Sequence, residues 1–465
     1  MNKLTYERPA IIRQVDGLMN KVGRPAPARP FDEIDGVRID DLVAQYGSPL
    51  FVFSERTIRH RIREAMQTFS VRYPRVQFAW SYKTNYLDAI CRIFHQEGSI
   101  AEVVSEMEYL KARRNGMLGS QIIYNGPYKT EASLKQAAAE GAMIHVDNFE
   151  EIAALEAVSD ELGKKLDVGI RINLDSQIYP QWDRFGFNLE SYQAYHAVKR
   201  MVSGGKLNLV TFHCHLGTFI LDPWAYARAI VKLLDFAAYL RAEFKIVIRN
   251  INMGGGFASS NTLHQQYLPG EQVSPSLAQY ADAISSVLMS SPIADQLNLI
   301  LESGRSLVDE AGSLISTVRA TKRLASGRRA IVLDAGVNLL FTAYWYKLQI
   351  LPVQPFQGLS EETTVYGPLC MNIDCVRDGV VLPDLQKGDR VAIRPAGAYC
   401  FTQSMQFIAL RPACILLGMN GEIDCIRRAE VLEDLVACES LPDRLAGEPA
   451  HQQDTRTSRV ISISR

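Results

Sequence analysis

Eight short apolar segments alternate with helix-like stretches in the first two thirds of the chain, and this alternation restricts the fold more than any other feature. The segments are rich in Val, Ile and Leu and mostly apolar, which is typical of parallel strands covered on both faces. Eight such alternations in about 240 residues match the number and size of a TIM (β/α)8 barrel. An open doubly wound sheet is the alternative, but it would usually have fewer strands and a glycine fingerprint after the first one. The predicted strands are 76–82, 100–104, 122–124, 143–146, 167–172, 209–213, 247–253 and 297–301. The predicted helices between them are 86–96, 105–115, 131–140, 150–162, 189–201 and 224–244.

The rest of the chain predicts a second, all-β domain. Beyond the alternating region, short apolar runs are separated by turn residues, as in a β-barrel or sandwich. The run 50–53 also predicts a strand, which we expect to join this domain. Both ends of the chain are expected to be weakly ordered because they are polar and lack apolar periodicity. The expected parts are an N-terminal extension 1–30, a segment 31–57 that joins the β domain, a barrel 58–311, a β domain 312–446 and a flexible tail 447–465.

The composition excludes several classes of function. Fifty Lys and Arg nearly balance 51 Asp and Glu, so no charge excess points to nucleic acid or to an anionic membrane. The N-terminus has no apolar signal core, and no run of eighteen apolar residues occurs. Eight scattered cysteines without CxxC pairs fit free thiols in a reducing compartment. We therefore expect a cytoplasmic protein without a metal site, a nucleic-acid partner or a membrane anchor.

Polar residues collect at the carboxyl ends of the predicted barrel strands, where TIM barrels place their active sites. Lys83 ends the first strand, and His215 follows the sixth. The glycine run 254–256 follows the seventh strand, and Glu302 and Arg305 follow the eighth. One end of the barrel therefore collects an amine, an imidazole, a glycine loop, a carboxylate and a guanidinium.

Each of these residues also has an ordinary structural explanation. A lone lysine is usually a solvated charge, but Lys83 ends an apolar strand, and partial burial lowers the pKa of lysines that form Schiff bases. A glycine run is usually a turn, although after a buried strand its N–H groups can approach a phosphate closely. Glu302 could pair with Arg305, or it could hold a pyridine nitrogen protonated. His215 is as well explained by a core histidine as by a ring stacked on a cofactor.

Six ordered motifs give the chain a resemblance to a known family. They are Phe78 to Asn85, His213 to Thr218, Gly254 to Phe257, Glu302 to Arg305, Gly367 to Cys370 and Gly397 to Tyr399. With them, the chain resembles the fold-type III pyridoxal-phosphate (PLP) decarboxylases, which include diaminopimelate, ornithine and arginine decarboxylases. The resemblance runs from about Tyr46 to Ala437. It implies a barrel of the alanine-racemase type, bound PLP and a homodimer with composite active sites.

The resemblance also implies roles for individual residues. Lys83 forms the aldimine with PLP, His215 stacks on its ring, Glu302 meets the pyridine nitrogen, and Cys370 protonates the quinonoid intermediate across the dimer interface. The implied catalytic residues are thus Lys83, Cys370, His215 and Glu302. The implied cofactor-binding residues are Lys83, Glu102, Arg171, His215, Thr218, Gly254, Gly255, Gly256, Glu302, Gly304, Arg305 and Tyr399, with Glu108 nearby. The implied substrate-binding residues are Arg305, Thr342, Tyr346, Met371 and Asp374.

The chain departs from the family pattern where the far end of the substrate would bind. Diaminopimelate enzymes carry Cys-Glu-Ser and ornithine enzymes Cys-Asp, whereas this chain has Cys370-Met371-Asn372. Thr342 stands where diaminopimelate enzymes place a carboxylate-binding arginine, and Ser303 replaces a proline. Losing a bidentate arginine removes contacts of roughly 1.5–3 kcal/mol each. The sequence therefore predicts a substrate other than diaminopimelate.

We expect a PLP-dependent decarboxylase of an α-amino acid, in specialised metabolism such as siderophore biosynthesis rather than in lysine biosynthesis. Three alternatives stay open: a diaminopimelate decarboxylase proper, an amino-acid racemase and a regulatory homologue without catalysis. A racemase should need a second base, which no motif supplies. A regulatory homologue should have lost Lys83 or Cys370, and the chain has both.

Overall fold

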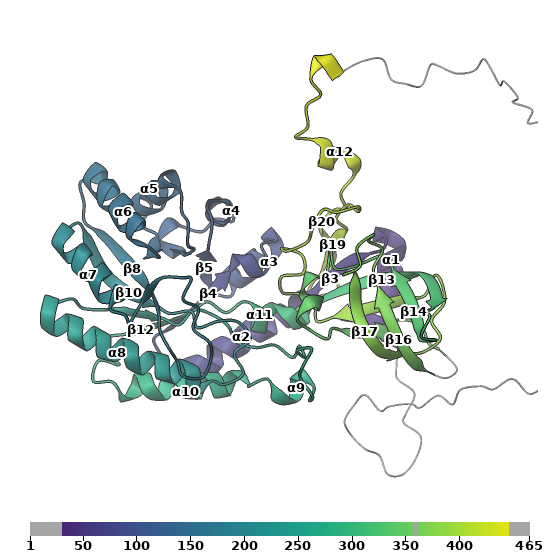
Figure 1. Cartoon of the computed structure of the whole chain (residues 1–465), viewed down its shortest axis with the longest axis horizontal. Helices are drawn as coiled ribbons and strands as arrows, with labels where there is room; N and C mark the ends of the chain where they lie inside the picture. Colours follow the sequence, from purple (N-terminus) through teal and green to yellow (C-terminus); the bar gives the residue numbers. More distant parts are fainter. Residues whose placement is uncertain (1–29, 357–359, 446–465) are drawn as a thin grey trace, which may run out of the picture. The chain divides into compact units, whose positions relative to one another are not determined.

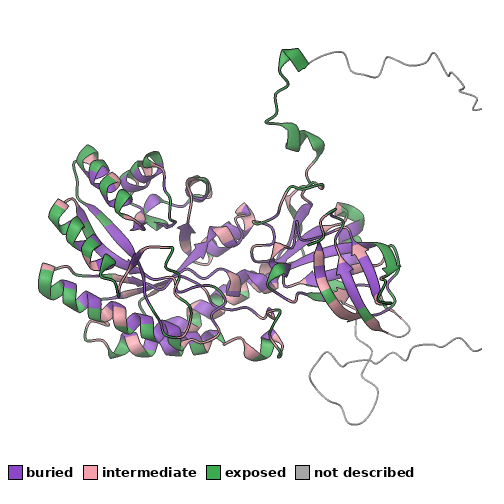
Figure 2. Ribbon diagram, in the orientation of Figure 1, coloured by how far each residue is buried: buried purple, intermediate pink, exposed green. Residues whose placement is uncertain are grey.

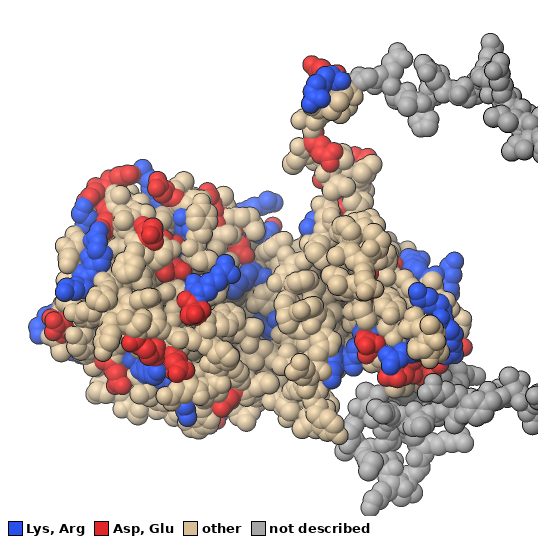
Figure 3. Space-filling model, viewed as in Figure 1, with Lys and Arg blue, Asp and Glu red and all other residues tan. Residues whose placement is uncertain are grey.

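The computed structural model describes residues 30–356 and 360–445 of the 465-residue chain. The predictions of weakly ordered ends, 1–30 and 447–465, therefore lie outside the described residues except for residue 30. No helix in the described ranges is long and apolar enough to cross a membrane. Basic and acidic side chains are interspersed on the face shown in Figure 3, in keeping with the net charge of −1.

Eight parallel strands form a closed barrel (Figure 1). The order around the ring follows the chain, and the ring closes where β12 pairs with β4 and where β10 pairs with β8. A two-residue strand, β9 (Phe187–Asn188), pairs in parallel with the last residues of β8 and is not one of the eight ring strands. All eight predicted strands are present, so the prediction of a TIM barrel is confirmed. The ring strands are β4 (Val76–Ser81), β5 (Ile100–Val103), β6 (Ile122–Tyr124), β7 (Met143–Val146), β8 (Leu166–Asn173), β10 (Leu207–His213), β11 (Asn250–Asn252) and β12 (Asn298–Leu301).

Helices surround the strands, with apolar faces turned inward and polar faces exposed (Figure 2). Several begin at a side-chain cap, because Ser, Thr or Asn accepts a backbone N–H of the first turn. Ser54, Ser105, Thr130 and Asn148 act in this way for α2, α4, α5 and α6. The helices of this part are α2 (Glu55–Ser70), α3 (Asp88–Gln96), α4 (Glu106–Arg114), α5 (Glu131–Ala139), α6 (Phe149–Leu162), α7 (Gln193–Gly204), α8 (Trp224–Phe244), α9 (Gly270–Val273), α10 (Leu277–Ser290) and α11 (Arg305–Val308).

A second sheet of mixed strand direction forms the β domain. Its N-terminal strand, β3, lies between β13, to which it is antiparallel, and β19, to which it is parallel. Helix α1 (Ile39–Tyr46) precedes β3, and a short hairpin of β1 (Glu33–Ile34) and β2 (Val37–Arg38) precedes that helix. The strands are β3 (Leu50–Ser54), β13 (Gly312–Arg323), β14 (Arg329–Leu333), β15 (Gln349–Pro352), β16 (Glu361–Tyr366), β17 (Cys375–Leu382), β18 (Arg390–Arg394), β19 (Ala413–Leu417) and β20 (Ile423–Arg427). The segment after Ala429, which includes α12 (Leu432–Val436), forms a separate unit.

The loop 397–402 of the β domain is bonded to the end of β4. Tyr399 donates its backbone N–H to the carbonyl oxygen of Thr84 at 2.8 Å. The Asn85 side chain donates to the carbonyl of Gly397 at 3.1 Å, and Thr402 Oγ1 donates to that of Lys83 at 2.9 Å. One hydrophobic core also contains residues of both the barrel and the β domain. The β domain therefore supplies Tyr399 to the same barrel end as Lys83.

Some boundaries differ from the sequence predictions for physical reasons. Helix α7 begins at Gln193 rather than at residue 189, because Tyr192 has a left-handed backbone with φ of +64°. Strand β11 covers only 250–252 of the predicted 247–253. The predictions did not include α10, β15, β17 and β20.

Candidate active site

Lys83 lies at the end of the barrel where the carboxyl ends of the strands meet. It belongs to a 3-10 turn, Tyr82–Thr84, that follows β4 directly, so the strand fixes its backbone. Its Nζ lies 2.6 Å from Oε2 of Glu102 on β5, and Ser81 Oγ donates to the same oxygen at 2.5 Å. The Glu102 side chain is fully buried, whereas 38% of the Lys83 side chain is exposed. The pair therefore has a buried anion and an accessible amine.

The electrostatic state of Lys83 differs from the sequence prediction. Burial opposes the charge on Lys83, but its surroundings, with Glu102 first among them, outweigh burial and raise the pKa of Lys83. The prediction of a pKa lowered by burial is wrong because the lysine faces Glu102 and Glu302. A charged lysine must lose a proton before its nitrogen can act as a nucleophile. Oε2 of Glu102 is the proton acceptor in direct contact.

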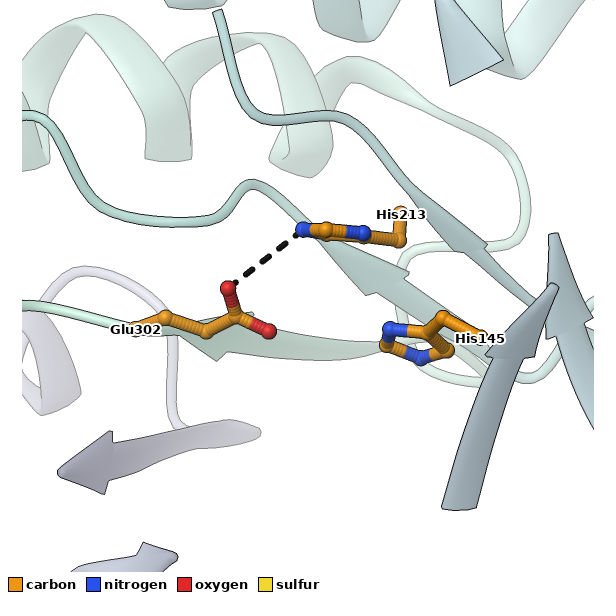
Figure 4. A group of neighbouring side chains, drawn as sticks. All are labelled: His145, His213 and Glu302. Atoms are coloured by element: carbon orange, nitrogen blue, oxygen red, sulfur yellow. Dashed lines mark ion pairs between the residues drawn. The ribbon is translucent and has the colours of Figure 1, made fainter. Parts of the chain in front are cut away.

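Glu302 follows β12 and is buried, with one oxygen fixed and the other open. Its Oε1 accepts hydrogen bonds from Asn125 Nδ2 at 2.8 Å and from Asn252 Nδ2 at 2.7 Å. Its Oε2 lies 3.3 Å from Nε2 of His213, as the dashed line in Figure 4 marks, and accepts no hydrogen bond from the described residues. Oε2 is thus available to an N–H donor that enters the site.

His215 and the glycine loop after β11 pack against each other. The backbone N–H of Gly255 donates to Nδ1 of His215 at 3.1 Å. A Cβ at Gly254 would lie 2.5 Å from His215 Nδ1, so a side chain would collide with the ring. Burial lowers the pKa of His215 well below its usual value. His215 is therefore a neutral ring held by a loop that requires glycine.

Arg305 supplies a positive charge on a side chain that is only 9% exposed and has unsatisfied donors. Its guanidinium lies 4.7 Å from the ring centroid of Tyr346 and 4.9 Å from that of Tyr399. Its Nη1 is 3.6 Å from Asp309, but Nε and Nη1 are buried and make no hydrogen bond to the described residues. Leaving such donors unpaired is costly. An anion such as a phosphate or a carboxylate would satisfy them.

The other expected cofactor residues lie around this group. Arg171, on β8, is buried, with its guanidinium 4.4 Å from the Phe185 ring. A Cβ at Gly304 would lie 2.1 Å from Oγ1 of Thr84, so the loop after β12 approaches the lysine turn closely. Thr218 is exposed in the loop after β10. Glu108, in α4, is buried and accepts the backbone N–H of Val104 at 2.9 Å.

The predicted substrate residues are only partly gathered. Tyr346 contacts Arg305, as above, and Thr342 is buried with its Oγ1 3.1 Å from Sγ of Cys400. Cys370 is exposed and Met371 is partly exposed, in the segment between β16 and β17. No hydrogen bond between described residues joins this segment to Lys83. Hydrogen bonds between the described residues therefore do not tie Cys370 or Met371 to the lysine of their own chain.

Asp374 has a structural set of contacts. One oxygen accepts the N–H of Val337 at 2.8 Å, and the other accepts that of Leu369 at 2.7 Å. These bonds hold the Cys370 segment against the segment after β14. This task differs from substrate binding, which stays a prediction for Asp374.

Sequence reasoning missed four polar residues that fix the site. Asn125 and Asn252 stand at the ends of β6 and β11, and Asp309 follows Arg305 by four residues. His145 lies within the predicted strand 143–146 and is not among the predicted site residues. The position of the two asparagines at strand ends was a usable signal, because polar residues there face the active site of a TIM barrel.

The residues present fit PLP. The amine of Lys83 is accessible, Oε2 of Glu302 is open to a donor, and Arg305 offers unpaired N–H groups beside a tight glycine loop. These groups match the aldehyde, the pyridine nitrogen and the phosphate of the cofactor. The site therefore satisfies the chemical requirements of PLP without a change of residue.

The buried Glu108 leads to a pH-dependent prediction. Burial raises the pKa of Glu108 from 4.5 to about 7. Between these two pH values, Glu108 keeps a proton in the folded protein but releases it in the unfolded chain. The contribution of Glu108 to the free energy of unfolding is therefore fully present below pH 4.5 and is lost as pH rises through 7. The free energy of unfolding of Glu108→Gln should not fall in this way over the same pH range. The expected difference from the wild type is about 3 kcal/mol at most. Urea unfolding of the cofactor-free protein from pH 4.5 to 8 measures the difference.

Glu150→Gln is the matched control, because Glu150 is exposed at the start of α6. It should leave the pH profile of unfolding as in the wild type. A Glu108→Gln profile parallel to that of the wild type would contradict a protonated Glu108.

Comparisons with known proteins agree with this geometry. A family model described as "Pyridoxal-dependent decarboxylase, pyridoxal binding domain" matches residues 59–309, more than half of the chain. The diaminopimelate decarboxylase of Aquifex aeolicus is 28% identical over 415 residues, which cover 87% of this chain and 94% of that protein. The diaminopimelate decarboxylase of Methanocaldococcus jannaschii is 29% identical over 432 residues, or 89% of this chain and 95% of that protein. A crystal structure of the M. jannaschii enzyme superimposes with a TM-score of 0.81 at 28% identity, covering 89% of this chain and 96% of that one. The chain therefore belongs to the pyridoxal-dependent decarboxylase family, and its cofactor is PLP.

Proposed function

We propose that this chain releases the α-carboxyl group of an amino acid as CO₂, with Lys83 as the residue that binds PLP covalently. The observation that carries the proposal is the gathering of three groups at one barrel end. They are the amine of Lys83, the open Oε2 of Glu302 and the unpaired N–H groups of Arg305. When bound, PLP supplies an electron sink for the bond that breaks at the α-carbon.

Each protein group has one task in this proposal. Glu102 accepts the proton that Lys83 must lose, since its Oε2 lies 2.6 Å from Nζ. Glu302 keeps a proton on the pyridine nitrogen through its open oxygen. Arg305, with the glycine loop beside it, binds the phosphate, and the neutral ring of His215 supports one face of the cofactor. These interactions orient the bond to the departing carboxylate.

We also propose a two-fold dimer that completes each site. Cys370 is exposed and lies in the β domain, and Ile373 in the same segment is 65% exposed. A thiol that protonates the α-carbon must come close to Lys83, and no hydrogen bond between described residues ties the Cys370 segment to the Lys83 turn. In a two-fold dimer, the partner subunit's Cys370 can complete the site, and two equivalent composite sites result.

For the substrate, the relatives favour diaminopimelate. Both relatives reported above carry the name diaminopimelate decarboxylase, and each match covers most of both chains. We therefore propose diaminopimelate as the first candidate, ahead of the specialised substrate expected from the sequence. The decarboxylated end would lie at Lys83 and the distal end near Tyr346.

A second candidate is an α-amino acid without the distal ammonium and carboxylate of diaminopimelate. It is favoured by Thr342, which is buried against Cys400 and cannot supply a positive charge. Met371 likewise supplies no negative charge for an ammonium. A substrate from siderophore biosynthesis belongs to this class, but no comparison supports that pathway.

Covalent cofactor binding is the direct test of the role of Lys83. Borohydride treatment of the holoprotein should fix PLP to the peptide that contains Lys83, as read by mass spectrometry. Lys83→Ala should lose the visible absorption band of bound PLP and lower kcat by several orders of magnitude. Lys111→Ala is the control, because Lys111, on the outer helix α4, pairs with Asp88 at the start of α3. Labelling of another lysine would overturn the assignment.

Substrate preference separates the two candidates. We expect meso-diaminopimelate to release CO₂ with a higher kcat/KM than ornithine or lysine, although with a high KM because Thr342 replaces a charged anchor. Carbon dioxide release over a panel of amino acids measures this. A substrate without a distal carboxylate that is used at least tenfold better, roughly 1.4 kcal/mol, would favour the second candidate.

Subunit mixing tests the composite site. Lys83→Ala and Cys370→Ala proteins should each be inactive, and their mixture should regain roughly a quarter of wild-type activity, because half of the random dimers carry one intact site. Native mass spectrometry confirms that subunits exchange. Exchange without recovered activity would contradict the shared site and leave Cys370 to act, if at all, in its own chain.

A further inference from the structure

Asn125 lies between the two carboxylates of the site and binds both. It follows β6, is 3% exposed, and donates from Nδ2 to Oε1 of Glu102 at 2.9 Å and to Oε1 of Glu302 at 2.8 Å. Its own Oδ1 lies 2.7 Å from Nδ1 of His145. One amide group therefore links the partner of Lys83 to the residue that faces the pyridine nitrogen.

Chemistry fixes which way this amide is turned. An ionised carboxylate only accepts hydrogen bonds, so the NH₂ group must face Glu102 and Glu302 and the carbonyl oxygen must face His145. That oxygen only accepts, so Nδ1 of His145 must carry a hydrogen. Burial lowers the pKa of His145 well below its usual value, so the ring is neutral. Its other nitrogen, Nε2, is then the one without a hydrogen, and it has no partner among the described residues.

The amide leaves the reactive oxygen of each carboxylate open. Oε1 of Glu102 is bound to Asn125, while its Oε2 contacts Lys83. Oε1 of Glu302 is bound to Asn125 and Asn252, while its Oε2 stays open. Oε2 of Glu102 therefore faces Lys83, and Oε2 of Glu302, which lies 3.3 Å from Nε2 of His213, is left for a donor that enters the site.

The same region offers a group of possible metal ligands, which the ring geometry disfavours. His145, His213 and Glu302 have ligand atoms within 4.8 Å of one another (Figure 4). The two imidazole rings, however, are stacked at 4.8 Å with an interplanar angle of 22°. Lone pairs in nearly parallel planes cannot meet at one ion about 2 Å from both nitrogens. The stacked pair instead holds His145 in place beside Asn125.

We propose that Asn125 is a positioning residue that couples Glu102 to Glu302, and that His145 keeps its amide in the productive orientation. Through this bridge, the carboxylate at Lys83 and the carboxylate at the pyridine nitrogen are held at a fixed spacing. The inference deepens the proposed function and rests on it, because the spacing matters only when PLP joins the two ends.

Cofactor affinity tests the role of Asn125. Asn125→Leu keeps the size but removes both donors, so PLP should dissociate from the holoprotein about 10- to 100-fold more readily, as expected for lost hydrogen bonds to charged groups. The visible absorption of bound PLP should also change its dependence on pH, because the charges at both ends of the cofactor are no longer fixed. Equilibrium dialysis and absorption spectra measure the two effects.

Asn298→Leu is the matched control. Asn298 begins β12 at the opposite end of that strand from Glu302, and its amide bonds Asn250 and the carbonyl of Arg249. This variant should lower the unfolding temperature without changing PLP affinity or the absorption profile. If Asn125→Leu behaves in the same way, with PLP affinity within twofold of the wild type, Asn125 is only structural and the proposal is wrong.

The tautomer of His145 gives a test that does not depend on activity. With ¹⁵N-labelled histidine, His145 should be neutral with its hydrogen on Nδ1 from pH 6 to 8, and its signal is identified by its loss in His145→Phe. Exposed His60 serves as the internal reference. His145→Phe keeps a ring beside His213 but removes the donor, so PLP affinity should fall as in Asn125→Leu. A neutral ring with its hydrogen on Nε2, which would leave Nδ1 without a hydrogen to donate to Asn125, would overturn the orientation argued above.

The proposed function and this inference fail in different ways. A wild-type protein that takes up no PLP, or fixes it at another lysine, would refute the proposed function. A wild-type protein that binds PLP at Lys83, combined with unchanged affinity in both variants, would refute the bridge alone.

Discussion

The parallel closure of the barrel is the constraint on which the site depends. Because β12 pairs with β4 and β10 pairs with β8, all eight strands end at the same rim. Residues far apart in sequence, such as Lys83, Arg171 and Glu302, then come together without any loop having to reach across the molecule. If the ring were an open sheet, the first and last strands would lie at opposite edges, and Lys83 could not share a site with Glu302.

The rim gathers charges that would be costly in isolation. Glu102 and Glu302 are both buried; Glu102 pairs with Lys83, and Arg171 pairs with the buried Asp147. Amide donors hold the anions, while burial keeps His145 and His215 neutral. A buried charge is tolerated when it is paired and hydrogen-bonded. Arg305 is the exception, because its Nε and Nη1 have no hydrogen-bond partner among the described residues, and a bound anion would satisfy them.

The strand order and the type of cofactor could be predicted from sequence because both depend on local patterns. Apolar runs of parallel strands and the residues directly after them are visible in the chain, and β6, β7 and α8 match their predicted limits. The bridge of Asn125 and the raised pKa of Lys83 could not be predicted in this way, because they depend on contacts between different strands. The start of α7 was missed for another reason, since a left-handed Tyr192 has no clear sequence signature.

The position of β3 has a consequence for how this protein is made. This strand precedes the barrel in the chain, yet its neighbours in the sheet, β13 and β19, are synthesised only after the barrel is complete. During synthesis, the apolar segment 50–54 therefore has no strand partner until residues 312–323 have left the ribosome, and its second edge stays unpaired until residues 413–417 follow. An unpaired apolar strand is a place where chains associate wrongly. The interval between the synthesis of the first strand and that of its last neighbour is thus the period when a chaperone would protect this protein most.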